Sequence, residues 1–183
     1  GTHDLGLASG LIARLRTDAT TPLPRFDKAR DDRAPEESWL AFQGPAAAIL
    51  VDGWCLGALP PPEGAPINAL EHEDIDETWR GMTWKQWQAR VRSELQASYA
   101  QFFAAFDALI YLQAPSWEIV RRWRAEQEEE TLGRALTSED ETRLDRFLMH
   151  YERLTRSMLA GHHSARWIVH LDERRNVVRV EER

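Results

Sequence analysis

The sequence is poor in cysteine, with Cys55 alone among its 183 residues. One thiol cannot form an internal disulfide, so the chain does not resemble the small secreted domains that disulfides hold together. A protein without structural disulfides suits a reducing compartment. We therefore expect a cytoplasmic location.

Long apolar runs are also missing. The longest, such as residues 46–51, are far shorter than the roughly 20 residues that a membrane-spanning helix needs. No secretory signal opens the chain, and its first residue is Gly1 instead of Met. We interpret this start as processed, cloned or truncated.

Positive charge is in deficit. The chain has 23 Lys and Arg against 30 Asp and Glu, a formal charge of −7. A general nucleic-acid binder carries a basic stripe, and an anionic membrane surface attracts basic segments. We expect neither partner.

No Cys, His and carboxylate spacing typical of a zinc site occurs. One acidic run lacks the glycine and the ligand spacing of an EF-hand loop, and it is interpreted as a solvated face. This run contains Glu71, Glu73, Asp74, Asp76 and Glu77.

What is present suffices for a folded core. The chain is 43% hydrophobic and 29% charged. Its length predicts a single domain that spans residues 1–183. Its eight Trp residues suit cores, interfaces or ligand walls alike.

Helical and strand patterns alternate along the chain, which predicts an α/β fold with a mostly parallel sheet flanked by helices. Asp4 is a candidate N-cap for a first helix that extends to about residue 16. Thr83-x-x-Gln86 matches a capping box and predicts a long helix, whose apolar stripe extends to Phe106. Further helices are expected over residues 116–130 and, after a Ser138-x-x-Glu141 capping box, to about 160. Buried strands are expected over residues 47–51, 108–112 and 167–171, with an extended stretch at 23–26 and a terminal strand at 177–180.

Ligands of parallel α/β sheets bind at the carboxyl ends of the strands. Asp52 and Gly53 end the first apolar strand, where P-loop enzymes place an acid near Mg²⁺ and phosphate. An ordinary strand end with an Asp-Gly turn gives the same pattern.

Each of two charged segments has both a functional and a purely structural interpretation. Residues 24–33 interleave both signs and could bind a polyanion and orient a hydroxyl nucleophile, or be a solvated loop of ion pairs. Arg121, Arg122 and Arg124 lie within one helical turn. They could clamp phosphoryl oxygens, or pair with the glutamates that follow on the same helix.

Seven segments, taken in order, resemble the D-glycerate 3-kinase-like branch of the P-loop kinases, a branch related to uridine kinase, phosphoribulokinase and pantothenate kinase. They are Gly1-Thr2-His3-Asp4, Pro24-Arg25-Phe26-Asp27-Lys28, Asp31-Asp32-Arg33, Asp52-Gly53-Trp54-Cys55-Leu56-Gly57-Ala58, Pro66-Ile67-Asn68-Ala69-Leu70-Glu71, Trp123-Arg124-Ala125-Glu126-Gln127-Glu128 and Tyr151-Glu152-Arg153-Leu154-Thr155-Arg156.

The resemblance implies transfer of the γ-phosphoryl group of ATP to a small hydroxyl-bearing, glycerate-like acceptor. The charged residues 24–33 suit an anionic acceptor. The resemblance also implies roles for eight residues of this chain. The catalytic residues would be Asp27, Lys28 and Asp52, and Asp52 would also lie beside Mg²⁺. The acceptor would be bound by His3, Asp4 and Arg33. A lid over the phosphates would contain Arg122 and Arg124. Many relatives carry Glu where this chain has Asp52.

The chain departs from that family in one respect: it contains no Gly-x-x-x-x-Gly-Lys-[Ser/Thr] loop, whose N–H groups and Lys hold a triphosphate. In the family that loop and the first strands lie upstream of the Gly-Thr-His-Asp segment. We therefore expect the acceptor-site and lid portion of a kinase, missing its first strands and inactive alone. Unpaired strand edges should then favour a homodimer or association with the missing N-terminal segment.

Two other readings remain open. A non-catalytic module derived from a kinase could keep the acceptor pocket and act through a partner. A protein-interaction domain could instead use exposed tryptophans, and an exposed apolar patch of several hundred Å² would mark it.

Overall fold

The computed structural model describes residues 3–27, 30, 32–62 and 83–183. Lys28, Asp31, residues 66–71 and the acidic run lie outside the described residues. The chain divides into two compact units, Gly1–Gly53 and Trp54–Arg183. Each is described by itself, and the expected single domain stays a prediction. Among the described residues, no helix is both long and apolar enough to cross a membrane.

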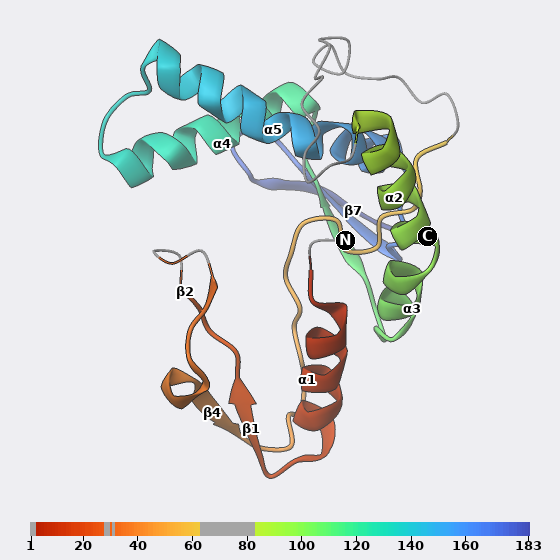
Figure 1. Ribbon diagram of the computed structural model, residues 1–183. Coiled ribbons are helices and arrows are strands. Elements are labelled where there is room, and N and C mark those ends of the chain that lie inside the picture. The colour runs from red at the N-terminus through yellow and green to blue at the C-terminus, as the bar shows by residue number, and fades with distance from the viewer. Residues whose placement is uncertain (1–2, 28–29, 31, 63–82) are drawn as a thin grey trace. The chain divides into compact units, whose positions relative to one another are not determined.

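The first unit joins a helix to short antiparallel strands (Figure 1). Helix α1 (Leu5–Thr17) begins where Asp4 accepts a hydrogen bond from the Leu7 N–H at 2.9 Å, which confirms the predicted N-cap. Strand β1 (Thr20–Leu23) pairs with β4 (Leu40–Gln43), and β2 (Phe26–Asp27) pairs with β3 (Asp32–Arg33). The 3-10 helix η1 (Glu36–Ser38) precedes β4.

The second unit is built around a three-stranded sheet in the order β5–β6–β7 (Figure 1). Strands β5 (Ile110–Gln113) and β6 (Trp167–Leu171) run parallel, and β7 (Val177–Glu182) is antiparallel to β6. Between β5 and β6 the chain forms a helical hairpin of α4 (Trp117–Leu132) and α5 (Ser138–Leu159). Helices α2 (Trp84–Gln96) and α3 (Ser98–Ala104) precede the sheet.

Local capping signals place most of these helices. Thr83 and Gln86 form the predicted capping box of α2, and the Ser116 side chain accepts a hydrogen bond from the Ile119 N–H at the start of α4. The box of α5 lies one residue earlier than predicted, at Thr137 and Asp140. Asp140 is the better partner because it also binds Arg134.

The core of the hairpin consists of Trp117, Leu144 and Leu148. Arg121 reinforces it with a two-pronged contact to Asp145 of α5, in which the donor–acceptor distances are 2.6 and 3.0 Å. The two helices are thus joined by both apolar packing and a charged pair.

The α/β class is confirmed, but three predictions about its elements are wrong. Residues 47–51 form no strand, and Leu50 is 97% exposed, because no segment among the described residues pairs with this run. The described sheets are not mostly parallel, since β5–β6 is their single parallel pair. The long helix breaks at Ala97, whose φ of −114° and ψ of −92° are not helical.

One face of the β5–β6–β7 sheet stays open. Ile168 is buried on the packed face, whereas Ile110 and Leu112 on the other face are 62% and 61% exposed. The predicted burial of residues 108–112 is therefore wrong, since none of them is fully buried and Leu109 and Tyr111 are only half-buried. β5 also pairs with a single neighbour among the described strands.

Candidate functional site

The N-terminal end of α1 holds the first pair of site residues. Asp4 uses one carboxylate oxygen, Oδ1, to cap α1, and its second oxygen, Oδ2, lies 3.2 Å from Nη1 of Arg33. The helix thus fixes the carboxylate, and the carboxylate fixes the guanidinium. These two residues are 29 positions apart in the sequence.

Arg33 reaches this position from the β2–β3 hairpin. The strand register places Phe26 opposite Arg33 and Asp27 opposite Asp32. The Arg33 N–H donates to the Asp32 side chain at 2.7 Å, and the Ala34 N–H donates to the Arg25 carbonyl at 2.8 Å. The hairpin therefore holds Arg33 at its base, and Asp27 lies in the next residue pair along the hairpin.

The Asp4–Arg33 pair is open to solvent. The two side chains are 53% and 52% exposed, so a ligand can reach them. A guanidinium has five N–H donors, and the contact with Asp4 occupies only part of them. The pair can therefore bind a carboxylate or phosphate through Arg33 and accept a hydroxyl hydrogen bond through Asp4.

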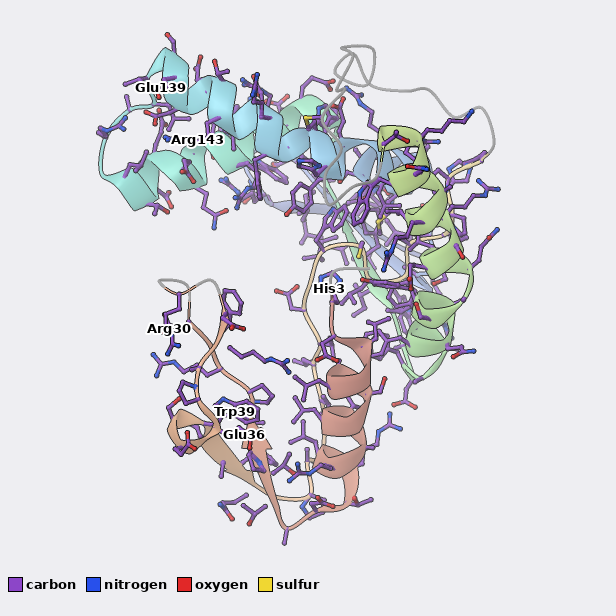
Figure 2. All side chains as sticks on the ribbon, viewed as in Figure 1. His3, Arg30, Glu36, Trp39, Glu139 and Arg143 are labelled. Atoms are coloured by element: carbon purple, nitrogen blue, oxygen red, sulfur yellow. The ribbon has the colours of Figure 1, made fainter. Side chains whose placement is uncertain are left out.

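Other predicted acceptor residues lie on the same elements. His3 directly precedes Asp4 at the N-terminal end of α1, and Arg30, a cation that was not predicted to bind the acceptor, lies on the β2–β3 hairpin (Figure 2). Trp39 and Glu36 follow the hairpin, where the Trp39 indole N–H donates to the Ala34 carbonyl at 2.8 Å. The first unit thus brings together Asp4 and Arg33, with His3 next to Asp4 in the chain and Asp27 on the strand that pairs with the strand of Arg33.

Asp52 is exposed in a segment without secondary structure, and no metal-ligand cluster surrounds it. Within the described ranges, no group of three or more His, Cys, Asp or Glu side chains could hold a metal ion. Mg²⁺ in nucleotide sites uses one or two carboxylates and takes its other ligands from phosphates and water. Asp52 could therefore hold Mg²⁺ only together with the phosphates of a bound nucleotide.

The two predicted lid arginines lie on α4 and have different surroundings. Arg122 donates to Oε2 of Glu173 from both terminal nitrogens at 3.1 Å and also to the Glu173 carbonyl at 3.3 Å. Its Nε lies 3.7 Å from Glu126, which agrees with the alternative of pairing along the helix. Arg124 instead donates to Gln127 and lies over the Phe147 ring.

Trp123 and Arg175 complete the contact between α4 and the turn after β6. The Trp123 indole N–H donates to the Glu173 carbonyl at 2.9 Å, and the Arg175 guanidinium lies 5.0 Å from the centroid of the Trp123 ring. Arg175 also pairs with Glu126 at 2.6 Å. In this arrangement Arg122 is a positioning residue of α4, and Arg124 is the more available cation.

Sequence reasoning missed Glu173 as a partner of Arg122, because it treated residues 173–176 only as a turn. The turn itself had a clear signal. The Asp172 side chain accepts hydrogen bonds from the Arg174 and Asn176 N–H groups, each at 2.8 Å. No sequence spacing shows that this turn meets α4, about 50 residues earlier.

Cys55 has an inert environment. The residue is buried in a left-handed turn with φ of 65°, and burial raises the pKa of its thiol to about 11. The Ala58 N–H donates to its carbonyl at 3.0 Å, and Ala58 forms a bridge with His163. This loop is therefore a structural connection to the start of β6.

The chain is similar in sequence to two curated kinases. It is 26% identical over 137 residues to the chloroplastic D-glycerate 3-kinase of Arabidopsis thaliana, covering 70% of this chain and 26% of that protein. It is 23% identical over 160 residues to the uncharacterized kinase mug58 of Schizosaccharomyces pombe, covering 82% of this chain and 54% of that protein. No protein-family model matches.

Two solved structures share the fold over the whole chain. The YGR205w protein aligns with a TM-score of 0.66, and the D-glycerate 3-kinase of Cryptococcus neoformans var. grubii with a TM-score of 0.65, each at 21% identity. The chain covers 65% and 68% of those structures. The resemblance to the D-glycerate 3-kinase-like branch and its P-loop kinase fold is confirmed.

Proposed function

We propose that this chain, as a relative of the D-glycerate 3-kinase-like branch, is the acceptor-site and lid portion of a small-molecule kinase. The longer parent would transfer the γ-phosphoryl group of ATP to a hydroxyl of a small, anionic, glycerate-like metabolite. The contact between Asp4 and Arg33 carries this proposal. It joins two residues that the resemblance assigns to one acceptor site.

Each residue of the pair would have a distinct task. Arg33 would bind the carboxylate of the acceptor with its remaining N–H donors. Asp4 would accept a hydrogen bond from a second, non-reacting hydroxyl and so orient the acceptor. Asp27, in the neighbouring strand, is the candidate for receiving the hydroxyl proton, and Lys28 and His3 complete the proposed site.

ATP and Mg²⁺ belong to the parent in this proposal. The 183 residues contain no Gly-x-x-x-x-Gly-Lys-[Ser/Thr] loop. Since phosphoryl transfer depends on positioning the triphosphate, we propose that the chain alone is inactive. Asp52 is retained as the acid that would lie near Mg²⁺ once phosphates supply its other ligands.

A pair of matched variants in the natural protein tests the acceptor site. Arg33→Gln removes the proposed carboxylate ligand, and Arg14→Gln is its control. Arg14 also pairs with an aspartate, Asp18, at 3.2 Å and is also 52% exposed, but it lies at the other end of α1. We expect Arg33→Gln to raise the KM for D-glycerate at least 10-fold, which corresponds to the loss of about one hydrogen bond to a charged group. Arg14→Gln should leave the KM within 2-fold of its original value. Equal effects would contradict the proposed site.

The missing phosphate loop favours one alternative, a non-catalytic binding module derived from a kinase. It would bind hydroxy acids through Arg33 without consuming ATP. A natural protein that lacks the loop over its whole length, yet binds D-glycerate in calorimetry, would support this alternative.

We also propose that the open face of the second unit is covered in the natural protein, either by an N-terminal segment or by a second copy of the chain. Two observations support such an association. Ile110 and Leu112 are exposed, and one edge of β5 pairs with no other strand among the described residues. Light scattering after size exclusion tests it. A monodisperse monomer of the natural protein, whose intact mass shows no segment beyond the 183 residues, would contradict it.

A further inference from the structure

Buried polar atoms without a partner gather in the C-terminal half of α5. The described residues include five buried side-chain nitrogen or oxygen atoms that form no hydrogen bond. Nε and Nη1 of Arg153 and Oγ of Ser157 account for three of them, and both residues belong to α5. Folded proteins pair nearly all of their buried polar atoms, so three unpaired ones on a single helix require a chemical explanation.

Arg153 and Ser157 share one face of α5. They are four positions apart, so the Ser157 hydroxyl lies one helical turn beyond the guanidinium. Tyr151 and Thr155 each precede one of these residues by two positions, or about 200° of helical rotation. Both of them contact Trp54. The Arg153 face is therefore opposite the side of α5 that meets Trp54.

The Arg153 guanidinium carries a charge that the described residues do not compensate. It stays protonated in a protein, and its Nε and Nη1 together carry three N–H groups. No carboxylate in the described part of the chain accepts a hydrogen bond from these nitrogens. The adjacent Glu152 pairs instead with Arg156 at 2.7 Å. A buried charge is costly unless an opposite charge accepts its hydrogen bonds.

From this arrangement we propose that Arg153 and Ser157 bind a small monocarboxylate. Its two oxygens accept hydrogen bonds from Nε and Nη1 of Arg153 and from the Ser157 hydroxyl. Arg153 is half-buried as a residue, so the site borders the surface. One guanidinium matches one negative charge, whereas sulfate or phosphate brings a second charge that it does not compensate.

The site is separate from the two cations discussed above. Arg33 belongs to the first unit, and Arg124 lies over Phe147, one turn before Tyr151 on α5. The monocarboxylate site therefore does not depend on the proposed kinase function.

Acetate binding to the 183-residue chain tests the proposal without phosphoryl transfer. Amide chemical shifts of α5 are followed by NMR in a chain that carries Arg33→Gln, which removes the carboxylate ligand of the proposed acceptor site. Failure of this site and failure of the proposed function are thereby distinguished. We expect acetate to bind at millimolar concentration, and sulfate to bind more weakly at equal ionic strength.

Substitutions on α5 assign this binding to its residues. Arg153→Met should weaken acetate binding at least 10-fold, and Ser157→Ala at least 3-fold, because each removes hydrogen bonds to a charged group. Arg146→Gln, at an exposed arginine of the same helix, is the control and should leave the affinity within 2-fold. Circular dichroism verifies that each variant is folded.

The urea midpoint gives a second reading. In chloride, Arg153→Met should raise the midpoint, because it removes a buried charge without a partner and keeps an apolar side chain in its place. Acetate should raise the midpoint of the chain with Arg153 more than that of Arg153→Met, since a ligand stabilises only the chain that binds it.

Four results would overturn the proposal. Acetate binding at α5 could be unchanged in Arg153→Met, or absent at millimolar concentration. Sulfate could bind at Arg153 as tightly as acetate. Arg153→Met could lower the urea midpoint in chloride, which would show that Arg153 already has a partner in the folded chain.

Discussion

Asp4 has two structural tasks, and two substitutions separate them. Its Oδ1 caps α1, and its Oδ2 contacts Arg33. Asp4→Asn keeps an oxygen that can cap the helix but removes the negative charge, whereas Asp4→Ala removes both functions. Loss of a side-chain cap costs about 0.5–2 kcal/mol, and loss of an exposed ion pair costs about 0.2–1 kcal/mol.

Hydrogen exchange of α1 measures these costs where they arise. A change of about 1.4 kcal/mol alters a local opening constant 10-fold. Asp4→Ala, which loses both the cap and the ion pair, should therefore accelerate exchange in α1 by about 3- to 140-fold. Asp4→Asn should accelerate it by no more than about 5-fold, close to the effect of Arg33→Gln, which removes the ion pair alone.

The comparison also separates folding from binding. In the natural protein, Asp4→Asn should impair acceptor use although α1 stays folded, because the proposed role of Asp4 requires its charge. Equal acceleration of exchange by Asp4→Asn and Asp4→Ala would refute the assignment of the cap. Acceptor use that is unimpaired in Asp4→Asn would refute the assignment of the binding role.

Three further predictions concern the second unit. Leu148→Ala, in the hairpin core, should lower the free energy of unfolding measured in urea titrations by about 2–5 kcal/mol. Leu132→Ala, at a side chain that is 40% exposed, should lower it by under about 1 kcal/mol. Similar losses for the two variants would contradict the assigned core. Asp140 accepts hydrogen bonds from Arg134 and from the Thr137 N–H, and these contacts lower its pKa below the ordinary 3.8. The stability that Asp140 contributes is therefore present above pH 3.8 and is lost as the pH falls through the lowered pKa of the folded state. Asp140→Asn should accordingly reduce the loss of the urea midpoint on acidification, and an unchanged pH profile would count against this contact. Cys55, with its pKa raised to about 11, should react slowly with Ellman's reagent at pH 8 until urea unfolds the chain, and fast reaction of the native protein would show that the thiol is not buried.

Local signals were sufficient for most of the fold. A cap needs only its own helix, so Asp4, Thr83 and Ser116 could be found from a few neighbouring residues. Strand β6 likewise begins and ends where its apolar run does. Residues 47–51 show the limit of this reasoning, because a strand exists only when a partner backbone pairs with it.

The site depended more on distant contacts. Asp4 and Arg33 each belonged to a recognisable motif, but only the fold of the first unit shows that their side chains meet. The sequence also could not distinguish Arg122 from Arg124. One meets Glu173 across the second unit, and the other faces Phe147 on the neighbouring helix.

Acceptor-dependent release of ADP tests the central claim most directly. The natural full-length protein, verified by intact mass and N-terminal sequence, is incubated with ATP, Mg²⁺ and D-glycerate or other small hydroxy acids. The account predicts ADP release that requires a hydroxy acid, and none from the 183-residue chain alone. A full-length protein without a phosphate loop, or one whose ADP release no hydroxy acid stimulates, would contradict it.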